Sequence, residues 1–185
     1  MRKPTAAVAL ATAVTALAAG TAGTAAAAPV PAGHLALHSW TLLNEKGPGP
    51  NPGERLTALV DARTVHGRTR GHAVVQHVFD KDGTIRVEFD IDCLTVGKDG
   101  AITVTGPTGT ATATPIGDGP VTTGPAGWHP ETGLTFYPAG ADGERRVGWA
   151  GANLIDPTKP AQATKCTAVP ASEWVIEGGT VLRRY

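Results

Sequence analysis

Serine is scarce in this chain of 185 residues, which contains only Ser39 and Ser172. Neither residue lies in Gly-x-Ser-x-Gly, the turn that exposes the nucleophile of many serine hydrolases. Ser39 follows His38, but adjacent residues of a strand point to opposite faces, so this pair cannot make the hydrogen bond of a catalytic triad. The sequence therefore disfavours a serine hydrolase.

An excess of positive charge is also missing, because 16 lysine and arginine residues balance 16 aspartate and glutamate residues. A nucleic-acid-binding surface needs a cluster of basic side chains to neutralise phosphates. The sequence contains no such cluster. We therefore expect no nucleic-acid partner.

The patterns of metal ligands are incomplete. His34 and His38 have the spacing of helical ligands, but their apolar neighbours indicate a strand, in which residues four apart lie about 13 Å from each other. His-Glu-x-x-His does not occur, and residues 80–83 lack the later oxygen ligands of a calcium loop. We expect neither a metal ion nor another cofactor.

The N-terminal residues have the order of a secretory signal peptide. Arg2 and Lys3 precede an uncharged run from Thr5 to Ala28, and the run ends in small residues. This order predicts cleavage after Ala27, so that residues 1–27 are a signal peptide and the protein is secreted to the extracellular space. A retained membrane anchor is the alternative, since the run is long enough to span a bilayer. After removal of the signal peptide we expect no membrane span.

Cys93 and Cys166 are the only two cysteines. An even number of cysteines in an oxidising compartment favours a disulfide bond between them. A metal-binding pair or a reactive thiol is the alternative.

Residues 85–93 have the clearest strand pattern. Apolar side chains at the odd positions alternate with charged side chains at the even positions. This period of two predicts a strand with a buried apolar face and a charged face that includes Glu88, Asp90 and Asp92. The three carboxylates could hold a cation or act as the acid and base of a glycosidase. The simpler interpretation is a solvated outer face, which also keeps sheets from pairing edge to edge.

The turn residues at 80–83 predict a hairpin between this strand and the one before it. A three-residue loop at 81–83 would set His72 opposite Asp92 on the polar face. The same register would leave His77 among core residues.

A second hairpin is predicted at the C-terminus, where Gly178-Gly179 separates two short strand-like runs. A two-residue turn at the glycines would place Glu173 opposite Arg184 and Trp174 opposite Arg183.

About eight or nine short strands, without a convincing amphipathic helix, predict an all-β fold. We expect an antiparallel meander closed into a small barrel, with a β-sandwich as the alternative. Residues 55–185 are expected to form a single β-domain. Residues 28–54 are expected to form an N-terminal segment with one further strand-like run and a Pro/Gly-rich linker. Two irregular stretches, 106–133 and 153–171, are expected to cross the barrel mouth or lie on its side.

Several short motifs follow one another in the sequence: Asp92-Cys93-Leu94, Val104-Thr105-Gly106 and Arg146-Val147-Gly148-Trp149, before the second cysteine. This order resembles that of small secreted proteins of high-GC Gram-positive bacteria, which are sometimes labelled repetin-like. The resemblance covers about residues 55–185. It implies a secreted β-domain closed by a disulfide bond and, because that family has no established activity, it implies no catalytic residue.

Four residues are candidates for binding a ligand. Trp128 and His129 lie in a loop, where no strand forces the tryptophan to be buried, although capping of the core is an equal alternative for Trp128. His72 and Asp92, expected to face each other on the polar side of the hairpin, are the other two candidates.

These features together favour a secreted, non-catalytic β-barrel that acts as a binding or cell-envelope-associated module. Its ligand, a small molecule or a protein, would lie in the barrel mouth. One alternative is a secreted hydrolase that uses Glu88, Asp90 and Asp92. Another is an extracellular interaction or inhibitor module that uses the loop within 106–133. An enclosed apolar cavity would favour the first function, a cleft that gathers the acids the second, and an ordered protruding loop the third.

Overall fold

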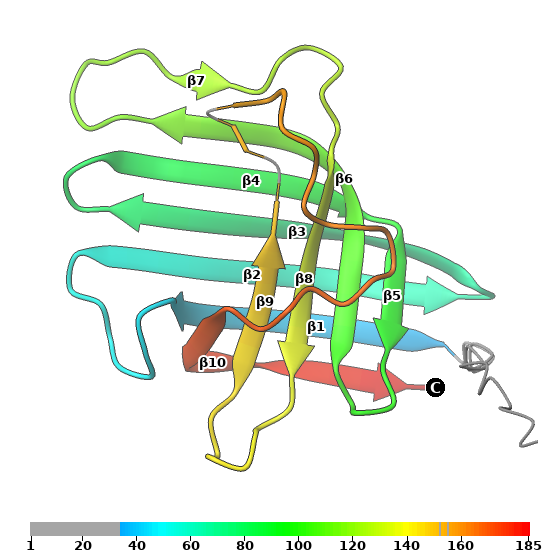
Figure 1. Cartoon of the computed structure of the whole chain (residues 1–185). Helices are drawn as coiled ribbons and strands as arrows, with labels where there is room; N and C mark the ends of the chain where they lie inside the picture. Colours follow the sequence, from blue (N-terminus) through cyan, green and yellow to red (C-terminus); the bar gives the residue numbers. More distant parts are fainter. Residues whose placement is uncertain (1–33, 152, 155) are drawn as a thin grey trace, which may run out of the picture. The chain divides into compact units, whose positions relative to one another are not determined.

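The computed structural model describes residues 34–151, 153–154 and 156–185, which form ten β-strands (Figure 1). The predicted signal peptide lies outside the described residues. The strands are β1 (Leu35–Asn44), β2 (Glu54–Val65), β3 (Arg68–Phe79), β4 (Gly83–Ile91), β5 (Cys93–Val96), β6 (Ile102–Thr114), β7 (Thr122–Thr123), β8 (Glu131–Tyr137), β9 (Arg146–Ala150) and β10 (Glu173–Arg184). Over these ranges the chain forms no helix of the length and apolarity that a membrane crossing needs.

Eight of these strands form a closed antiparallel barrel. Hydrogen bonds join them in the order β4-β3-β2-β1-β10-β9-β8-β6, and pairing of β6 with β4 closes the ring. β5 and β7 pair with β6 outside the ring. The all-β barrel predicted from the sequence is therefore confirmed, and the alternative of a sandwich is not.

Closure depends on β6, which is long enough to pair with different neighbours along its length. Its first half, from Ile102 to Pro107, pairs with β8, and its second half, from Thr108 to Thr114, pairs with β4. The register shifts between Glu88 and Phe89 where the second pairing begins. Such an irregularity increases the local bend of a strand, and β6 curves around the barrel at this point (Figure 1).

The barrel interior is filled by inward-facing side chains from the alternating positions of each strand. Phe89 is 0% exposed and is the largest of the fully buried side chains. The buried core comprises Leu37, Leu43, Leu56, Ala58, Val60, Ala62, Ala73, Val75, Phe89, Ile91, Leu94, Val104, Leu134, Phe136 and Val147. Burial of this apolar set is the main force that stabilises the closed barrel.

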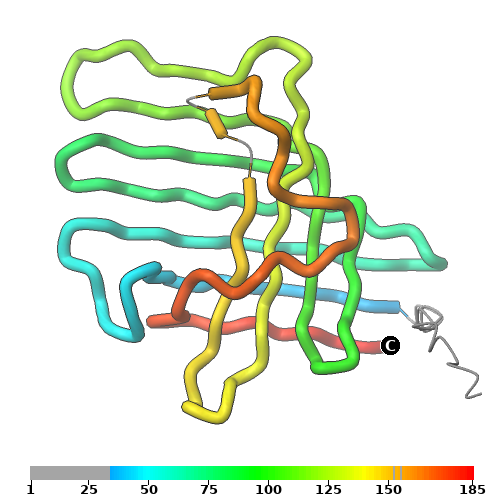
Figure 2. Tube along the Cα trace, viewed as in Figure 1, coloured from blue at the N-terminus to red at the C-terminus, as the bar shows by residue number. Residues whose placement is uncertain are grey.

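A segment without regular structure, residues 156–172, covers the outer face of β8 and β9 (Figure 2), and we call it the strap. The Val169 N–H donates a hydrogen bond to Thr135 Oγ1 at 2.8 Å, and the Tyr137 hydroxyl donates to the Val169 carbonyl at 2.6 Å. A disulfide bond between Cys93 and Cys166 ties the strap to β5, as the sequence predicted. The strap thus lies on the side of the barrel.

The hairpin of β3 and β4 forms as predicted, but its register differs by two residues. Phe79 pairs with Gly83 and His72 pairs with Asp90, so the expected pairing of His72 with Asp92 is wrong. Gly83 begins β4 and has a φ of 110°, which glycine adopts readily. The loop therefore consists of the three residues before it. A shift of two residues preserves the faces, so the apolar side of β4 still points inward.

The predicted C-terminal hairpin is wrong, because β10 is one continuous strand through both glycines. It pairs with β1 over ten positions and with β9 at its start. Glu173 therefore faces Val147 and Arg184 faces Leu35, in place of the expected pairing with each other. The long ladder with β1 satisfies more backbone groups than a hairpin of four-residue arms. As a result, β1, from the segment expected to precede the β-domain, is one of the eight strands of the barrel.

Candidate binding site at the barrel mouth

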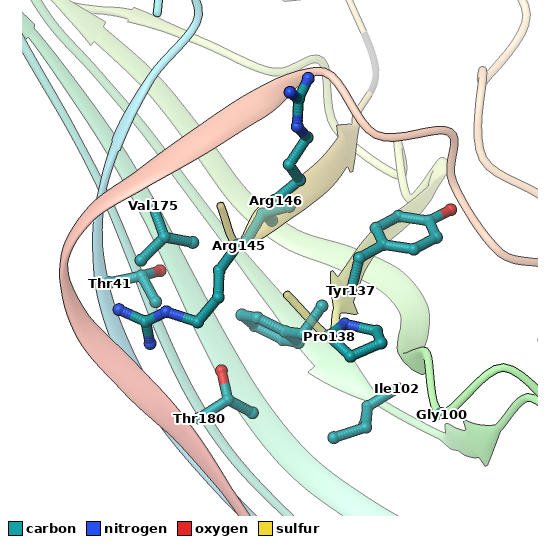
Figure 3. Close-up of a pocket in the computed structure, with 11 residues that line it drawn as sticks. Thr41, Gly100, Ile102, Tyr137, Pro138, Arg145, Arg146, Val175 and Thr180 are labelled. Carbon is teal, nitrogen blue, oxygen red and sulfur yellow. The ribbon is translucent and has the colours of Figure 1, made fainter. Parts of the chain in front are cut away.

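A pocket of about 190 Å³ opens at one end of the barrel, which we call the barrel mouth (Figure 3). It lies between the β5–β6 turn, the end of β8, the start of β9, and the facing residues of β1 and β10. The lining residues are Thr41, Gly100, Ile102, Phe136, Tyr137, Pro138, Arg145, Arg146, Val147, Val175 and Thr180.

The floor of the pocket is apolar. Phe136 and Val147 are buried members of the barrel core, and Ile102 and Val175 are half-buried residues packed against it. An apolar floor favours ligands that carry a hydrocarbon or aromatic group. The pocket is smaller than most sites for drug-sized ligands, which restricts it to small molecules.

Arg145 supplies a positive charge at the entrance. It directly precedes β9, two residues before the inward-facing Val147, and it is exposed while lining the pocket. Figure 3 shows this side chain extending between Thr41 and Thr180. The Val175 N–H donates to the Arg145 carbonyl at 2.9 Å, which fixes the backbone of Arg145 against β10.

The Arg145 guanidinium retains most of its hydrogen-bonding capacity. Its Nη1 donates to the Gly178 carbonyl at 3.0 Å, and no carboxylate in the described part of the chain pairs with it. The neighbouring Arg146 is committed elsewhere: its Nη2 lies 3.1 Å from Asp142 Oδ2, and its guanidinium lies over the Trp174 ring at 4.4 Å. Because a guanidinium has five N–H donors, Arg145 can still bind a carboxylate through two of them.

Two hydroxyl groups complete the polar side of the pocket. Thr180 Oγ1 lies 2.9 Å from Ser39 Oγ, and Thr41 Oγ1 makes only a long contact of 3.5 Å with the Ala58 carbonyl. Both hydroxyls can donate to an anionic group or accept from a neutral one. Together with Arg145 they form a small polar rim above an apolar floor.

A second pocket of about 210 Å³ differs in chemistry. It is lined by Leu56, Val75, His77, Ile85, Val87, Trp149, Asn153 and Leu154, and contains neither lysine nor arginine. Its His77 imidazole lies 3.4 Å from Glu54. The pocket at the barrel mouth therefore offers an anion a cationic partner, Arg145, and this second pocket offers none.

The candidate residues of the loop do not lie at the barrel mouth. Trp128 packs against a small core cluster of Val87, Ala111 and Leu154. His129 is exposed, and its Nδ1 lies 2.7 Å from the Thr108 carbonyl.

His72 and Asp92 lie on the outer face of the barrel and have different partners. His72 contacts Glu88 at 3.3 Å and Asp90 at 3.5 Å, whereas Asp92 pairs with Lys165 of the strap. The four sequence candidates are thus not assembled into one site.

The carboxylates of β4 lie on the solvent side, where Glu88 pairs with Arg86 and Asp90 contacts the His72 imidazole. A hydrogen bond from Arg86, together with contacts to His72, holds the pKa of Glu88 below its ordinary value. The neighbouring Asp92 raises the pKa of Lys165 by accepting a hydrogen bond from it. Because the carboxylates follow one another along a single open face, they do not form the facing acid and base of a glycosidase. The described residues also include no group of histidine, cysteine and acidic side chains suited to hold a metal ion.

Sequence reasoning missed Arg145, although a signal for it was present. Counting back by two from the apolar Val147 predicts that Arg145 faces inward and Arg146 outward. The hydroxyls of Thr41 and Thr180 carried no such signal, because their position at the mouth depends on pairing between the two ends of the chain.

No known family, curated protein or solved structure matches this chain. The resemblance to small secreted proteins therefore stays an expectation from short motifs. Any functional conclusion depends on the geometry of the pocket itself.

Proposed function

We propose that the protein is a secreted, non-catalytic binding module that takes a small organic carboxylate with an apolar body at the barrel mouth. The observation that carries this proposal is the exposed Arg145 guanidinium, which lines an apolar-floored pocket and has no carboxylate partner among the described residues. The carboxylate would bind the guanidinium and the Thr180 hydroxyl. The apolar body would lie against Phe136.

Two further features support export and a binding role. The N-terminal order of charged, apolar and small residues is that of a signal peptide, and a disulfide bond is typical of an oxidising compartment. The acids considered for hydrolysis, Glu88, Asp90 and Asp92, lie on an outer face, where their partners are Arg86, His72 and Lys165, and not in the pocket. Binding without turnover is therefore the function that this geometry favours.

The size of the pocket sets the expected affinity. A ligand of about ten non-hydrogen atoms that gains about 0.4 to 0.8 kcal/mol per atom binds with about 4 to 8 kcal/mol, so we expect a Kd in the millimolar to micromolar range. Benzoate is a suitable probe because it joins a carboxylate to a flat apolar ring. Benzamide has the same shape without the charge and serves as the matched ligand control.

Isothermal titration of the secreted protein with both probes tests the proposal. We expect benzoate to bind and benzamide to bind at least ten-fold more weakly. Arg145→Gln should weaken benzoate binding about 10- to 100-fold, since a hydrogen bond to a charged group contributes about 1.5 to 3 kcal/mol. Arg183→Gln, which removes an exposed charge from the outer side of β10, is the control and should bind normally. Equal binding of the two probes, or unchanged binding by Arg145→Gln, would overturn the proposal.

A further inference from the structure

The outer face of β1 to β4 carries two parallel rows of side chains that cross the strands. The first row contains alternating histidine and aspartate residues in direct register: His38, Asp61, His72 and Asp90. The second row contains Trp40, Leu59, Val74 and Glu88, also in direct register. Since the rows are two residues apart along each strand, they lie about 7 Å from each other.

The second row exposes apolar surface to solvent. Trp40 is 36% exposed and Leu59 is 47% exposed, and the neighbouring Val181 of β10 is 53% exposed. These residues line an open groove of about 500 Å³, which also includes His38, Asp61 and His72. A contiguous exposed apolar patch with a polar edge is typical of a binding surface.

The Trp40 ring is held in place by a glycine of β10. A Cβ atom at Gly178 would lie 2.1 Å from the Trp40 carbonyl oxygen and 2.4 Å from Trp40 Cε3, and φ of Gly178 is 87°. Only glycine allows the ring to lie this close to the strand. The ring is therefore supported on one side by backbone and is preorganised for contact with a ligand on the groove side.

The first row offers hydrogen-bonding groups in fixed positions. His38 Nδ1 lies 3.0 Å from Asp61 Oδ2, and the two ring nitrogens of His72 face Glu88 and Asp90. These side chains are all at least 30% exposed, so their remaining donors and acceptors meet solvent. A ligand with several hydroxyl groups could bond to the row without breaking the pairs within it.

The opposite outer face of the barrel, unlike the groove, is covered by another segment of the chain. There, the strap covers β8 and β9, and Val169 is buried against them. Over β1 and β2, no segment of the described ranges covers Trp40 and Leu59.

We propose that this groove is a second binding site, which takes a neutral oligosaccharide. One face of a sugar ring presents C–H groups that can stack on Trp40, while its rim of hydroxyls can bond to Asp61 and His38. A purely apolar ligand would leave the adjacent charged row without partners and is therefore a poorer fit. The groove is open along the rows, which suits a chain of sugars. This site is independent of the proposed carboxylate site, because the groove and the barrel mouth have no lining residue in common.

Binding of cellohexaose, chitohexaose and mannohexaose to the secreted protein, measured by NMR and titration calorimetry, tests this inference. We expect at least one of the three to bind, and its resonance shifts to include the Trp40 side chain. Trp40→Ala should reduce the affinity at least ten-fold, and Trp40→Phe should reduce it less. Asp61→Ala should also weaken binding. Tyr185→Ala removes another exposed aromatic and should have no effect.

Two controls separate the possible failures. The urea midpoint of each variant shows whether it is folded. If Trp40→Ala is unfolded, Asp61→Ala provides a second test of the site. Arg145→Gln should bind the oligosaccharide normally, so loss of the carboxylate site leaves this site intact. The inference is overturned if none of the three oligosaccharides binds, or if Trp40→Ala binds as well as the wild type. A dimer in sedimentation experiments that Trp40→Ala dissociates would instead assign the groove to a second copy of the chain.

Discussion

Substitutions at two adjacent residues of β4 test the orientation of that strand. Phe89 is 0% exposed in the barrel core, and Asp90 is on the outer face with 79% of its side chain exposed. Phe89→Ala removes a large buried ring and should cost about 3 to 5 kcal/mol of unfolding free energy. Asp90→Asn removes only an exposed contact to His72 at 3.5 Å and should cost about 0 to 1 kcal/mol.

Urea unfolding of the two variants measures this difference. With a denaturant slope of about 2 kcal/mol per molar urea, Phe89→Ala should lower the midpoint by about 1.5 to 2.5 M. Asp90→Asn should lower it by less than about 0.5 M. If Asp90→Asn were the more damaging change, the acids would face the interior. If Asp90→Asn abolished a hydrolytic activity and left the protein folded, the hydrolase alternative would replace the binding proposal.

Four further outcomes are expected. Intact-mass analysis of culture supernatant should find a protein that starts near Ala28, and a cell-bound protein that retains the N-terminus would contradict secretion. Reduction of the disulfide, which spans 73 residues, should cost about 4 kcal/mol in urea unfolding, and an unchanged midpoint would refute its stabilising role. Gly178→Ala should cost about 1 to 3 kcal/mol because of its positive φ and its contact with Trp40, whereas Gly49→Ala has open space and should be neutral. Burial raises the pKa of Tyr137, so stability should hold below about pH 10 and fall above it as the unfolded chain loses this proton first. In Tyr137→Phe that alkaline loss should shrink, and an unchanged alkaline profile would refute the assignment.

The strand pattern of the sequence predicted the all-β class, the barrel and the inward face of its clearest strand. Alternation at 85–93 identified the inward face of β4, and the turn residues at 80–83 located the hairpin of β3 and β4 that the structure contains. The even number of cysteines predicted the disulfide. These features are local, or depend on a single pair of residues, and a sequence displays them directly.

The pairings between distant strands could not be predicted in the same way. Gly178-Gly179 has the composition of a tight turn, but pairing with β1, where Trp40 lies more than 130 residues earlier, makes it part of a continuous strand. The barrel mouth has the same origin, since Arg145 meets Thr41 and Thr180 only after β1 and β10 have paired. The sequence likewise did not distinguish Trp40 from the other three tryptophans, because its close contact with Gly178 depends on the pairing of β1 with β10. Sites formed by non-local contacts leave little trace in local composition.

Chemical-shift mapping of benzoate on the protein tests binding at the barrel mouth most directly. A two-dimensional amide spectrum recorded during the titration should show saturating shifts at Gly100, Thr180 and Gly178, which line or adjoin the pocket. The same titration of Arg145→Gln should leave those resonances nearly unmoved. Shifts centred instead on His77 and Trp149 of the second pocket, or no saturating shift at all, would contradict the proposal.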